Sequence, residues 1–336
     1  MKAIVIDEFG GPATMMQREL PQPVPGDDEV LIRIAYAGVN PIDWKIREGL
    51  MAKVFPHQFP ITLGWDASGT IVQVGRHVAP SRIGQFVFAY CRQYGTPVGR
   101  GTYAEFIALP AAMAVVAPAN LHPAQAAAIP LPALTAWQGL HTAGQLVAGE
   151  TVLITGGAGG VGSMAIQIAL HAGARVLTVA SLENHAFVLS LGAHAAIDYR
   201  GTALADGLRE LAPDGVNLLL DCVGGTYLSE GLRYLRPGGR MVTIAGVPDV
   251  LLAGELGVTA QRIVATANPA QLQAIADLLA AGTLVPPPLE EMDLADVTAA
   301  HAKSKAGHVR GKIVLKVAEQ VAVNLADGIA AGRKNS

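Results

Sequence analysis

The strongest constraint on the fold comes from residues 151–174, which read TVLITGGAGGVGSMAIQIALHAGA. The pattern predicts a buried strand, a glycine turn and a helix with an apolar face, and the run RVLTVA at 175–180 predicts a second strand. Gly157, Gly159 and Gly162 occupy the three positions of G-x-G-x-x-G. Such glycines allow a tight turn, close approach of backbone N–H groups to a pyrophosphate, and close helix-to-strand packing. The segment therefore predicts a dinucleotide-binding βαβ unit; the alternative is an ordinary glycine-rich turn.

The residues that follow this segment have the sequence pattern of an α/β domain. Apolar runs at 216–221, 240–245 and 262–266 alternate with Ala-rich stretches of helical periodicity. Strands that alternate with helices of about 10 to 15 residues indicate βαβ units and a parallel sheet covered on both faces. We therefore expect a doubly wound, Rossmann-type domain over residues 126–267.

The first 120 residues differ, because their apolar runs are short and broken by Gly and Pro. Runs such as 29–39 and 69–75, with turn signals between them, predict an all-β unit of barrel or sandwich type. The last run, 311–317, is isolated from the α/β segment and is expected to pair with this first unit. The predicted division is thus 1–125 with 268–336, and 126–267.

Composition excludes several functions. Lys and Arg number 24 against 27 Asp and Glu, the net charge is −3, and no long basic run occurs, so neither nucleic acid nor an anionic membrane is an expected partner. Frequent Pro and Gly interrupt the apolar region at 105–175, so no membrane span is predicted. Asp7 and Glu8 stand where a signal peptide needs an apolar run, which favours the cytoplasm.

The residues at the end of the second strand indicate whether the cofactor is NAD(H) or NADP(H). The strand ends Val-Ala-Ser at 179–181, so it lacks the carboxylate that NAD-binding units usually offer to the ribose 2′-OH. NADP(H) is therefore favoured, with NAD(H) still possible, and Ser181 is a candidate donor to the 2′-phosphate. No Lys or Arg lies close by in sequence; Asn184 and His185 are the nearest donors and Glu183 is adjacent.

The chain resembles the zinc-independent, quinone oxidoreductase branch of the medium-chain dehydrogenases/reductases. The likeness covers nearly all of residues 1–317. Its main carriers are AGVNPIDWKIREG (37–49), FPITLGWDASGTIVQVG (59–75), GETVLITGGAGGVG (149–162), LDCVGG (220–225) and GHVRGKIVL (307–315). The resemblance implies a GroES-like β-barrel catalytic domain beside the Rossmann domain, and a homodimer joined through edge strands of the nucleotide domain.

The same resemblance implies the cofactor contacts. Beside the motif glycines Gly157 and Gly162, the implied contacts are Gly159, Gly160 and Val161 at the pyrophosphate, Ser181, Asn184 and Tyr199 at the adenosine end, Val223, Ala245 and Gly246 at later strand ends, and Thr135 near the nicotinamide. Asn184 stands where many relatives place a Lys or Arg for the 2′-phosphate.

No catalytic zinc is expected. In the alcohol dehydrogenases of this superfamily a Cys occupies the position of Asn40, a His that of Trp65, and another Cys lies near Pro132. A catalytic zinc needs three protein ligands and an open position, and this chain lacks all three ligands.

Without a Lewis acid, the favoured substrates are acceptors that take a hydride directly, such as quinones, enals and enones, whose oxygen receives the charge. The segment NPIDWK supplies two candidate donors to that oxygen, the Asn40 amide and the Lys45 ammonium, and Asp43 as orienting group or proton relay. Tyr94 and Trp65 are candidate pocket residues, with a core role as the alternative for Trp65. Two other functions stay open: a non-catalytic NADP(H)-binding sensor or structural protein, and an enoyl-thioester reductase.

Overall fold

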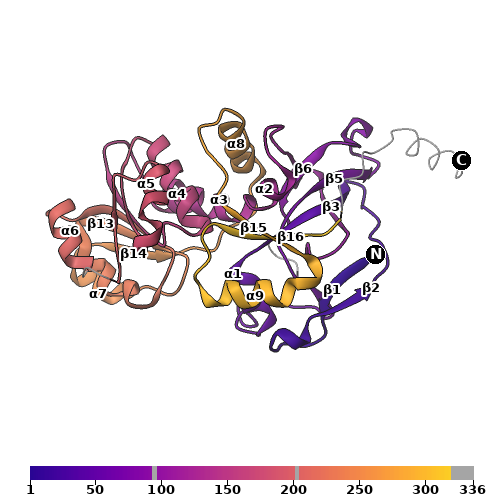
Figure 1. Ribbon diagram of the computed structural model, residues 1–336, viewed down its shortest axis with the longest axis horizontal. Helices are drawn as coiled ribbons and strands as arrows, with labels where there is room; N and C mark the ends of the chain where they lie inside the picture. Colours follow the sequence, from indigo (N-terminus) through magenta and orange to yellow (C-terminus); the bar gives the residue numbers. More distant parts are fainter. Residues whose placement is uncertain (93–96, 201–203, 319–336) are drawn as a thin grey trace, which may run out of the picture. The chain divides into compact units, whose positions relative to one another are not determined.

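The computed structural model describes residues 1–92, 97–200 and 204–318. The chain forms two compact units (Figure 1). The first, which we call the β unit, comprises Met1–Leu131, Ala267–Ala280 and the residues from Pro288 on. The second, the Rossmann unit, comprises Pro132–Thr266 and Ala281–Pro287.

The short segment Ala281–Pro287 belongs to the Rossmann unit, whereas the sequence division assigns it to the other domain. The side chain of Gln167 accounts for this, because it bonds both the backbone N–H and the backbone carbonyl of Val285. Its Oε1 accepts from the Val285 N–H at 2.7 Å and its Nε2 donates to the Val285 carbonyl at 3.1 Å.

The β unit contains two sheets. The order of the seven-stranded sheet is β15-β16-β3-β5-β6-β8, with β7 paired to β3, and that of the three-stranded sheet is β2-β1-β4. The strands are β1 (Lys2–Ile6), β2 (Met16–Glu19), β3 (Glu29–Val39), β4 (Ile61–Thr62), β5 (Asp66–Val74), β6 (Phe86–Tyr90), β7 (Phe106–Pro110), β8 (Val115–Val116), β15 (Leu289–Asp293) and β16 (Lys312–Lys316). The predicted pairing of the last run is confirmed, because β16 lies antiparallel to β3 with Ile313 opposite Val39.

Side chains at alternate positions of β3 build the core of this unit. Val30, Ile32 and Ile34 are buried together with Ile71 of β5 and Val87 of β6. The period of two residues places them on one face of the sheet. This packing fixes the register of β3, whose far end leads into the segment NPIDWK.

Among the described residues four α-helices begin with proline, whose fixed φ and missing N–H suit the first helical position. They are α1 (Pro41–Arg47), α2 (Pro123–Ala127), α3 (Pro130–Trp137) and α8 (Pro269–Ala280). α9 (Val297–Ala306) packs against α1 within the β unit. The helix α1 is thus held between the end of β3 and α9.

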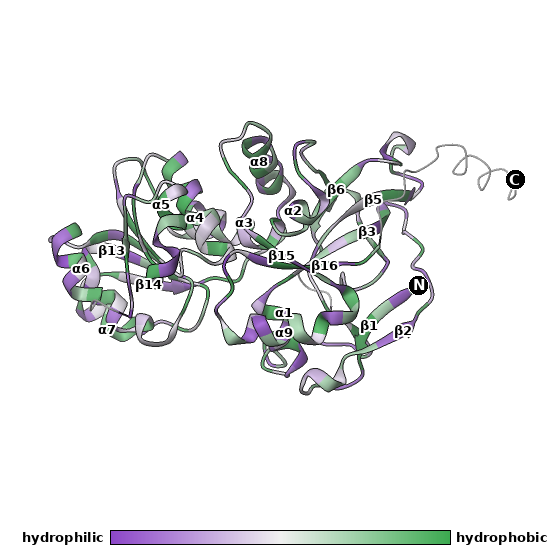
Figure 2. Cartoon of the chain, viewed as in Figure 1, coloured by the Kyte–Doolittle hydropathy of each residue, from purple (hydrophilic) through white to green (hydrophobic). Residues whose placement is uncertain are grey.

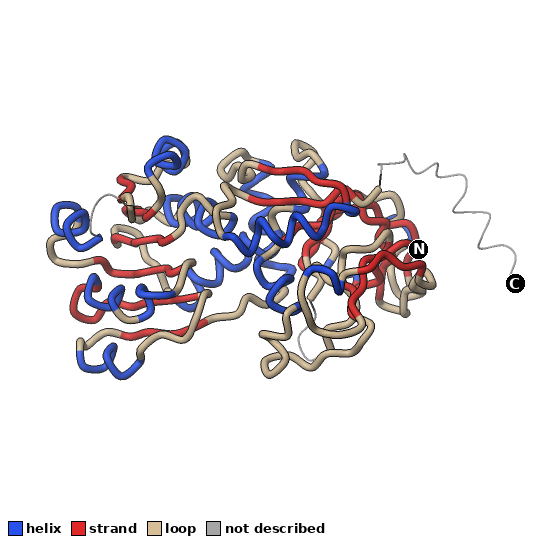
Figure 3. The backbone as a smooth tube through the Cα atoms, turned by 60° about the horizontal axis from the view of Figure 1, so that its bottom comes forward, coloured by secondary structure: helices blue, strands red, loops and turns tan. Residues whose placement is uncertain are grey.

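The Rossmann unit is built on a six-stranded parallel sheet of order β11-β10-β9-β12-β13-β14, the doubly wound order. Figure 3 shows its strands side by side. They are β9 (Thr151–Thr155), β10 (Arg175–Val179), β11 (Ala195–Ile197), β12 (Val216–Asp221), β13 (Leu235–Thr243) and β14 (Thr259–Arg262). The helices are α4 (Gly160–His171), α5 (His185–Ser190), α6 (Leu204–Leu211) and α7 (Val250–Glu255).

Every residue of the central strand β12 is buried, so both faces of the sheet are covered there. The last strand, β14, covers Thr259–Arg262 rather than the predicted 262–266. As an edge strand it has the polar sequence TAQR and is largely exposed, and Figure 2 shows its hydrophilic colouring. For this reason the search for apolar runs in the sequence did not find β14. Within the described residues, none of the helices has the length and apolar character needed to cross a bilayer.

Candidate functional site

The glycine turn joins β9 to α4 and is held at several points. The Gly157 N–H donates to the Val179 carbonyl and the Gly159 N–H to the Gly156 carbonyl, each at 3.0 Å. Gly156 has φ +66°, a conformation that residues with a Cβ rarely adopt. The turn is therefore tied to the end of β10 and has one defined shape.

The three motif glycines have different surroundings. A Cβ on Gly157 would lie 2.0 Å from the Thr178 hydroxyl oxygen, and one on Gly162 would lie 2.2 Å from the Gly156 carbonyl oxygen. A Cβ on Gly159 would meet only that same oxygen, at 3.4 Å. The first and third glycines thus permit packing within the protein, whereas the second borders open space.

The open position lies at the start of α4, for which Gly159 is the N-cap. The first N–H groups of a helix have no acceptor within the helix, and the helix dipole favours an anion there. Gly160 and Val161 supply such groups. The residues present therefore fit a pyrophosphate, which a side chain on Gly159 would displace.

The carboxyl ends of the three central strands are held together by Asp221. Its carboxylate accepts from the hydroxyls of Thr155 on β9, at 2.8 Å, and Thr243 on β13, at 2.7 Å. It also accepts from the backbone N–H groups of Val223 and Gly224 at 3.0–3.1 Å. Sequence reasoning did not single out Asp221, although it lies in the segment LDCVGG. The predicted contact residues Val223, Ala245 and Gly246 follow directly on these strand ends.

The predicted adenosine-end residues also come together. Ser181 is buried at the end of β10, and the Asn184 Nδ2 donates to its hydroxyl oxygen at 3.0 Å. Tyr199, just beyond β11, is about half exposed. A cation that sequence reasoning missed lies here: the Arg200 guanidinium is 5.3 Å from the Tyr199 ring centre and 3.2 Å from a Glu183 carboxylate oxygen. The fold thus brings an arginine to a strand tip that lacks one in sequence.

Thr135, predicted to lie near the nicotinamide, is buried on α3.

In the β unit, Asn40 is part of a buried network. Its Nδ2 donates to Asp66 at 2.8 Å and its Oδ1 accepts from the Lys312 ammonium at 2.6 Å. The same ammonium donates to the Val39 carbonyl at 2.5 Å. Both ends of the Asn40 amide therefore have partners inside the protein, and its role as a donor to substrate stays a prediction.

Asp43 is the first-turn acid of α1 and is fully buried. Its Oδ2 accepts from the Asn40 N–H at 2.7 Å and from the Tyr103 hydroxyl at 3.0 Å. Its Oδ1 has no hydrogen-bond partner among the described residues. Burial raises the pKa of Asp43 to about 7 and that of Asp66 to about 6, and burial lowers the pKa of Lys312. The charge of Lys312 acts on both carboxylates and lowers their pKa against the effect of burial.

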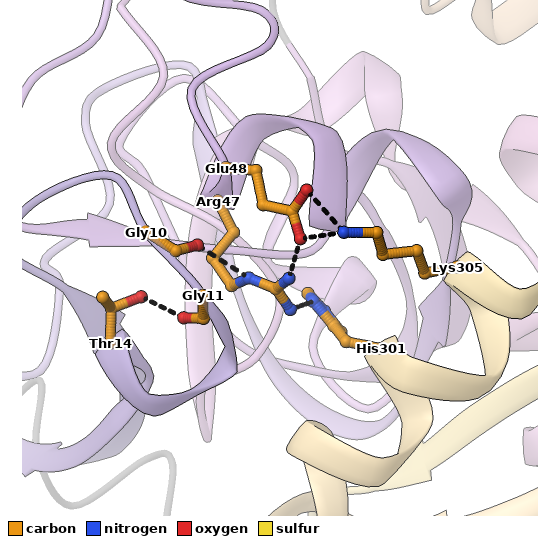
Figure 4. A network of polar contacts seen from close by, with 7 residues as sticks. All are labelled: Gly10, Gly11, Thr14, Arg47, Glu48, His301 and Lys305. Carbon is orange, nitrogen blue, oxygen red and sulfur yellow. Dashed lines mark hydrogen bonds and ion pairs between the residues drawn. The ribbon is translucent and has the colours of Figure 1, made fainter.

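Hydrogen bonds connect Arg47 on α1 to His301 on α9, a contact that Figure 4 shows, and continue from His301 through Tyr103 to Asp43. Arg47 donates to Nδ1 of His301 at 3.1 Å, so Nε2 of this imidazole carries the proton. Nε2 lies 3.3 Å from the Tyr103 hydroxyl, which donates to Asp43. Burial, followed by the charge of Arg47, lowers the pKa of His301 to about 3. Arg47 also donates to the Gly10 carbonyl and to Glu48, so its direction is set.

The other residues predicted for the substrate side are Lys45, Trp65 and Tyr94. The Lys45 ammonium is 5.6 Å from the centre of the Trp44 ring. Trp65 packs edge-on against Phe55 and Tyr90, which is an aromatic core. Tyr94 lies outside the described residues.

Comparison with known proteins agrees with this architecture. Residues 26–119 match the family described as alcohol dehydrogenase GroES-like domain, and residues 191–315 match the zinc-binding dehydrogenase family. The chain is 30% identical over 322 residues to the NADPH-dependent alkenal/one oxidoreductase of Arabidopsis thaliana chloroplasts, covering 94% of this chain and 79% of the relative.

Solved structures give the same result. The quinone oxidoreductase from Coxiella burnetii has a TM-score of 0.84 and 30% identity, covering 95% of this chain and 99% of the other. Mycobacterial Rv1454c complexed with NADPH has a TM-score of 0.82 and 30% identity, covering 94% of this chain and 100% of the other.

The chain belongs to the medium-chain dehydrogenase/reductase family of oxidoreductases, in its zinc-independent, quinone oxidoreductase-like branch. The predicted family and fold class are thereby confirmed, and nicotinamide dinucleotide binding is expected of such a chain. The family that matches residues 191–315 is named for zinc binding. Among the described residues, no three His, Cys, Asp or Glu side chains are grouped so that they could hold a metal ion.

Proposed function

We propose that this protein is an NADPH-dependent oxidoreductase that transfers a hydride to a quinone or an α,β-unsaturated carbonyl compound. The observation that carries the proposal is the open side of Gly159 at the start of α4, where a pyrophosphate fits. The names of the relatives, an alkenal/one oxidoreductase and a quinone oxidoreductase, support the substrate class. The NADPH-dependence of one relative and the NADPH complex of another support the choice of cofactor.

The bound cofactor supplies the hydride. The protein's own contribution in the Rossmann unit is to hold the pyrophosphate on the N–H groups of Gly160 and Val161 and the adenosine end at Ser181 and Tyr199. The Asp221 carboxylate keeps the strand ends that carry Val223 and Ala245 at a fixed spacing. Such preorganised positioning lowers the barrier of a transfer that needs no covalent intermediate.

In the β unit we propose Asn40, Asp43 and Lys45 as the substrate-side residues. A conjugated acceptor places its negative charge on oxygen, and hydrogen-bond donors stabilise that charge. Asn40 Nδ2 carries two hydrogens, one of which is directed at Asp66. We assign the second to the substrate oxygen, with the Lys45 ammonium as a further donor and Asp43 as the group that orients Asn40.

The test of the cofactor site is Gly159→Ala. Gly159 has φ −79°, which alanine adopts without strain, so the variant should keep its melting temperature. Its Kd for NADPH, from fluorescence titration, should rise at least about tenfold, because the methyl group occupies the position of the pyrophosphate. Gly254→Ala is the matched control: it lies in the same unit, within α7, and a Cβ there meets no atom within 4 Å. Equal NADPH affinity in both variants would refute the site.

The test of the activity follows the absorbance of NADPH against quinones, enals, enones and enoyl thioesters. Turnover of quinones or enones is the expected result. NADPH binding without turnover of any acceptor would favour the non-catalytic sensor or structural protein, and turnover confined to enoyl thioesters would favour the thioester reductase.

We further propose that the protein acts in the cytoplasm as a homodimer. The exposed edge strand β14, which ends the Rossmann sheet, supports the dimer because an open strand edge favours pairing with a second copy. A monomeric mass in multi-angle light scattering at micromolar concentration would refute the dimer.

A further inference from the structure

Two segments that are distant in sequence meet at the carboxyl edge of β10 and β11. These strands are parallel, with Val179 opposite Ile197. The residues that follow them therefore leave the sheet on the same side. This brings Glu183, in the short helix η5 (Leu182–Asn184), to Arg200.

The Glu183 carboxylate accepts hydrogen bonds from several neighbouring donors. Arg200 Nη1 lies 3.2 and 3.4 Å from its two oxygens. The pKa of Glu183 is lowered by its own backbone N–H, by the Ser181 hydroxyl and by the charge of Arg200. Ser181 in turn accepts from Asn184 at 3.0 Å. A hydroxyl and a guanidinium that bind one carboxylate are donors that also suit a phosphate monoester.

Among the described residues, the Arg200 side chain contacts Glu183 and Tyr199, and the contact with Glu183 is weak enough to be exchanged. The side chains of Arg200 and Glu183 are 51% and 58% exposed, and an ion pair between such exposed groups contributes little. Stacking of the guanidinium on the Tyr199 ring is compatible with either partner. A phosphate carries nearly two charges and accepts bidentate bonds from arginine, so it competes well with a single carboxylate.

We propose that Arg200 is the cation that recognises the 2′-phosphate of NADPH, and that the Glu183 carboxylate is an internal competitor for the same donors. This inference rests on the proposed cofactor. It explains how the chain recognises a 2′-phosphate although Asn184 is uncharged, because the missing cation comes from the end of β11. It also implies that Glu183 limits the preference for NADPH over NADH.

The experiment measures binding rather than turnover, by calorimetry on the full chain. The probes are adenosine 2′,5′-bisphosphate and adenosine 5′-monophosphate, which differ only in the 2′-phosphate. Arg200→Gln should weaken the bisphosphate about tenfold or more and leave the monophosphate within twofold, because a charge-assisted hydrogen bond is lost. Glu183→Gln should strengthen the bisphosphate about three- to tenfold, and Arg200→Lys should recover part of the affinity.

Arg209→Gln is the matched control, since Arg209 pairs with Asp206 at 2.8 Å in the same unit and both side chains are exposed. It should change neither affinity. The inference is overturned if Arg200→Gln leaves the bisphosphate-to-monophosphate ratio unchanged, or if Glu183→Gln lowers it. Titration of the wild-type protein with NADPH and NADH distinguishes failure of the proposed function from failure of this inference. If neither nucleotide binds, the proposed function is refuted. If both bind and Arg200→Gln has no effect, only this inference is refuted.

Discussion

The carboxylate of Asp221 offers the sharpest test of how the nucleotide-binding edge is held together. Four donors converge on it: the hydroxyls of Thr155 and Thr243 and the N–H groups of Val223 and Gly224. Each hydroxyl oxygen also accepts a backbone N–H, from Cys222 and from Ala245 respectively. The two hydroxyl protons are thereby directed at Asp221, and the site has little freedom to rearrange.

Asp221→Asn keeps the shape of this side chain and replaces one acceptor oxygen with an NH₂ group. In one orientation the amide nitrogen faces the Thr243 hydroxyl, and in the other it faces the Thr155 hydroxyl. Either way one buried hydroxyl loses its acceptor, which costs about 1–3 kcal/mol, and the other donors lose a charged acceptor at about 1 kcal/mol each. We expect the free energy of unfolding of the Rossmann unit to fall by about 4–6 kcal/mol, the sum of these losses.

Urea denaturation followed by far-UV circular dichroism measures this loss. The control is Asp249→Asn, because Asp249 caps α7 by accepting the Leu252 N–H at 3.0 Å and asparagine caps equally well. The control should change stability by less than about 0.5 kcal/mol. A loss below about 1 kcal/mol in Asp221→Asn would show that the carboxylate does not hold the three strands, and the reasoning would be refuted.

Two further predictions concern the side chains of His301 and Glu150. The pKa of His301 is about 3 in the folded chain against 6.5 when exposed, so its neutral form stabilises the fold and this contribution is lost as pH falls from about 6.5 toward 3. His301→Gln should remove up to about 1.4 kcal/mol per pH unit of that slope, and urea titrations at several pH values check it; a pH-independent difference from wild type would contradict it. Glu150 accepts from Arg240 at 2.9 Å and from Asn217 at 3.2 Å, so Glu150→Gln should lower the free energy of unfolding by about 1–3 kcal/mol in urea, and an unchanged midpoint would count against this ion pair.

The sequence was sufficient to predict those elements whose pattern lies within one short stretch of the chain. The strand, glycine turn and helix at 151–174 are contiguous, and the close packing around Gly157 and Gly162 leaves no room for a Cβ at either position. The edge strand β14 was misplaced because its polar residues give no apolar signal.

The sequence alone therefore determined the dinucleotide turn, the parallel α/β region and the β unit that precedes it, since short-range periodicity and glycine sterics encode them. Only the tertiary structure decided which charges meet. Lys312 reaches Asn40 across 272 residues, His301 reaches Tyr103 across 198, and Arg200 pairs with Glu183 from the neighbouring strand. Hydrogen bonds and ion pairs act over a few ångströms of space, and chain separation carries no information about such distances until the sheets have formed.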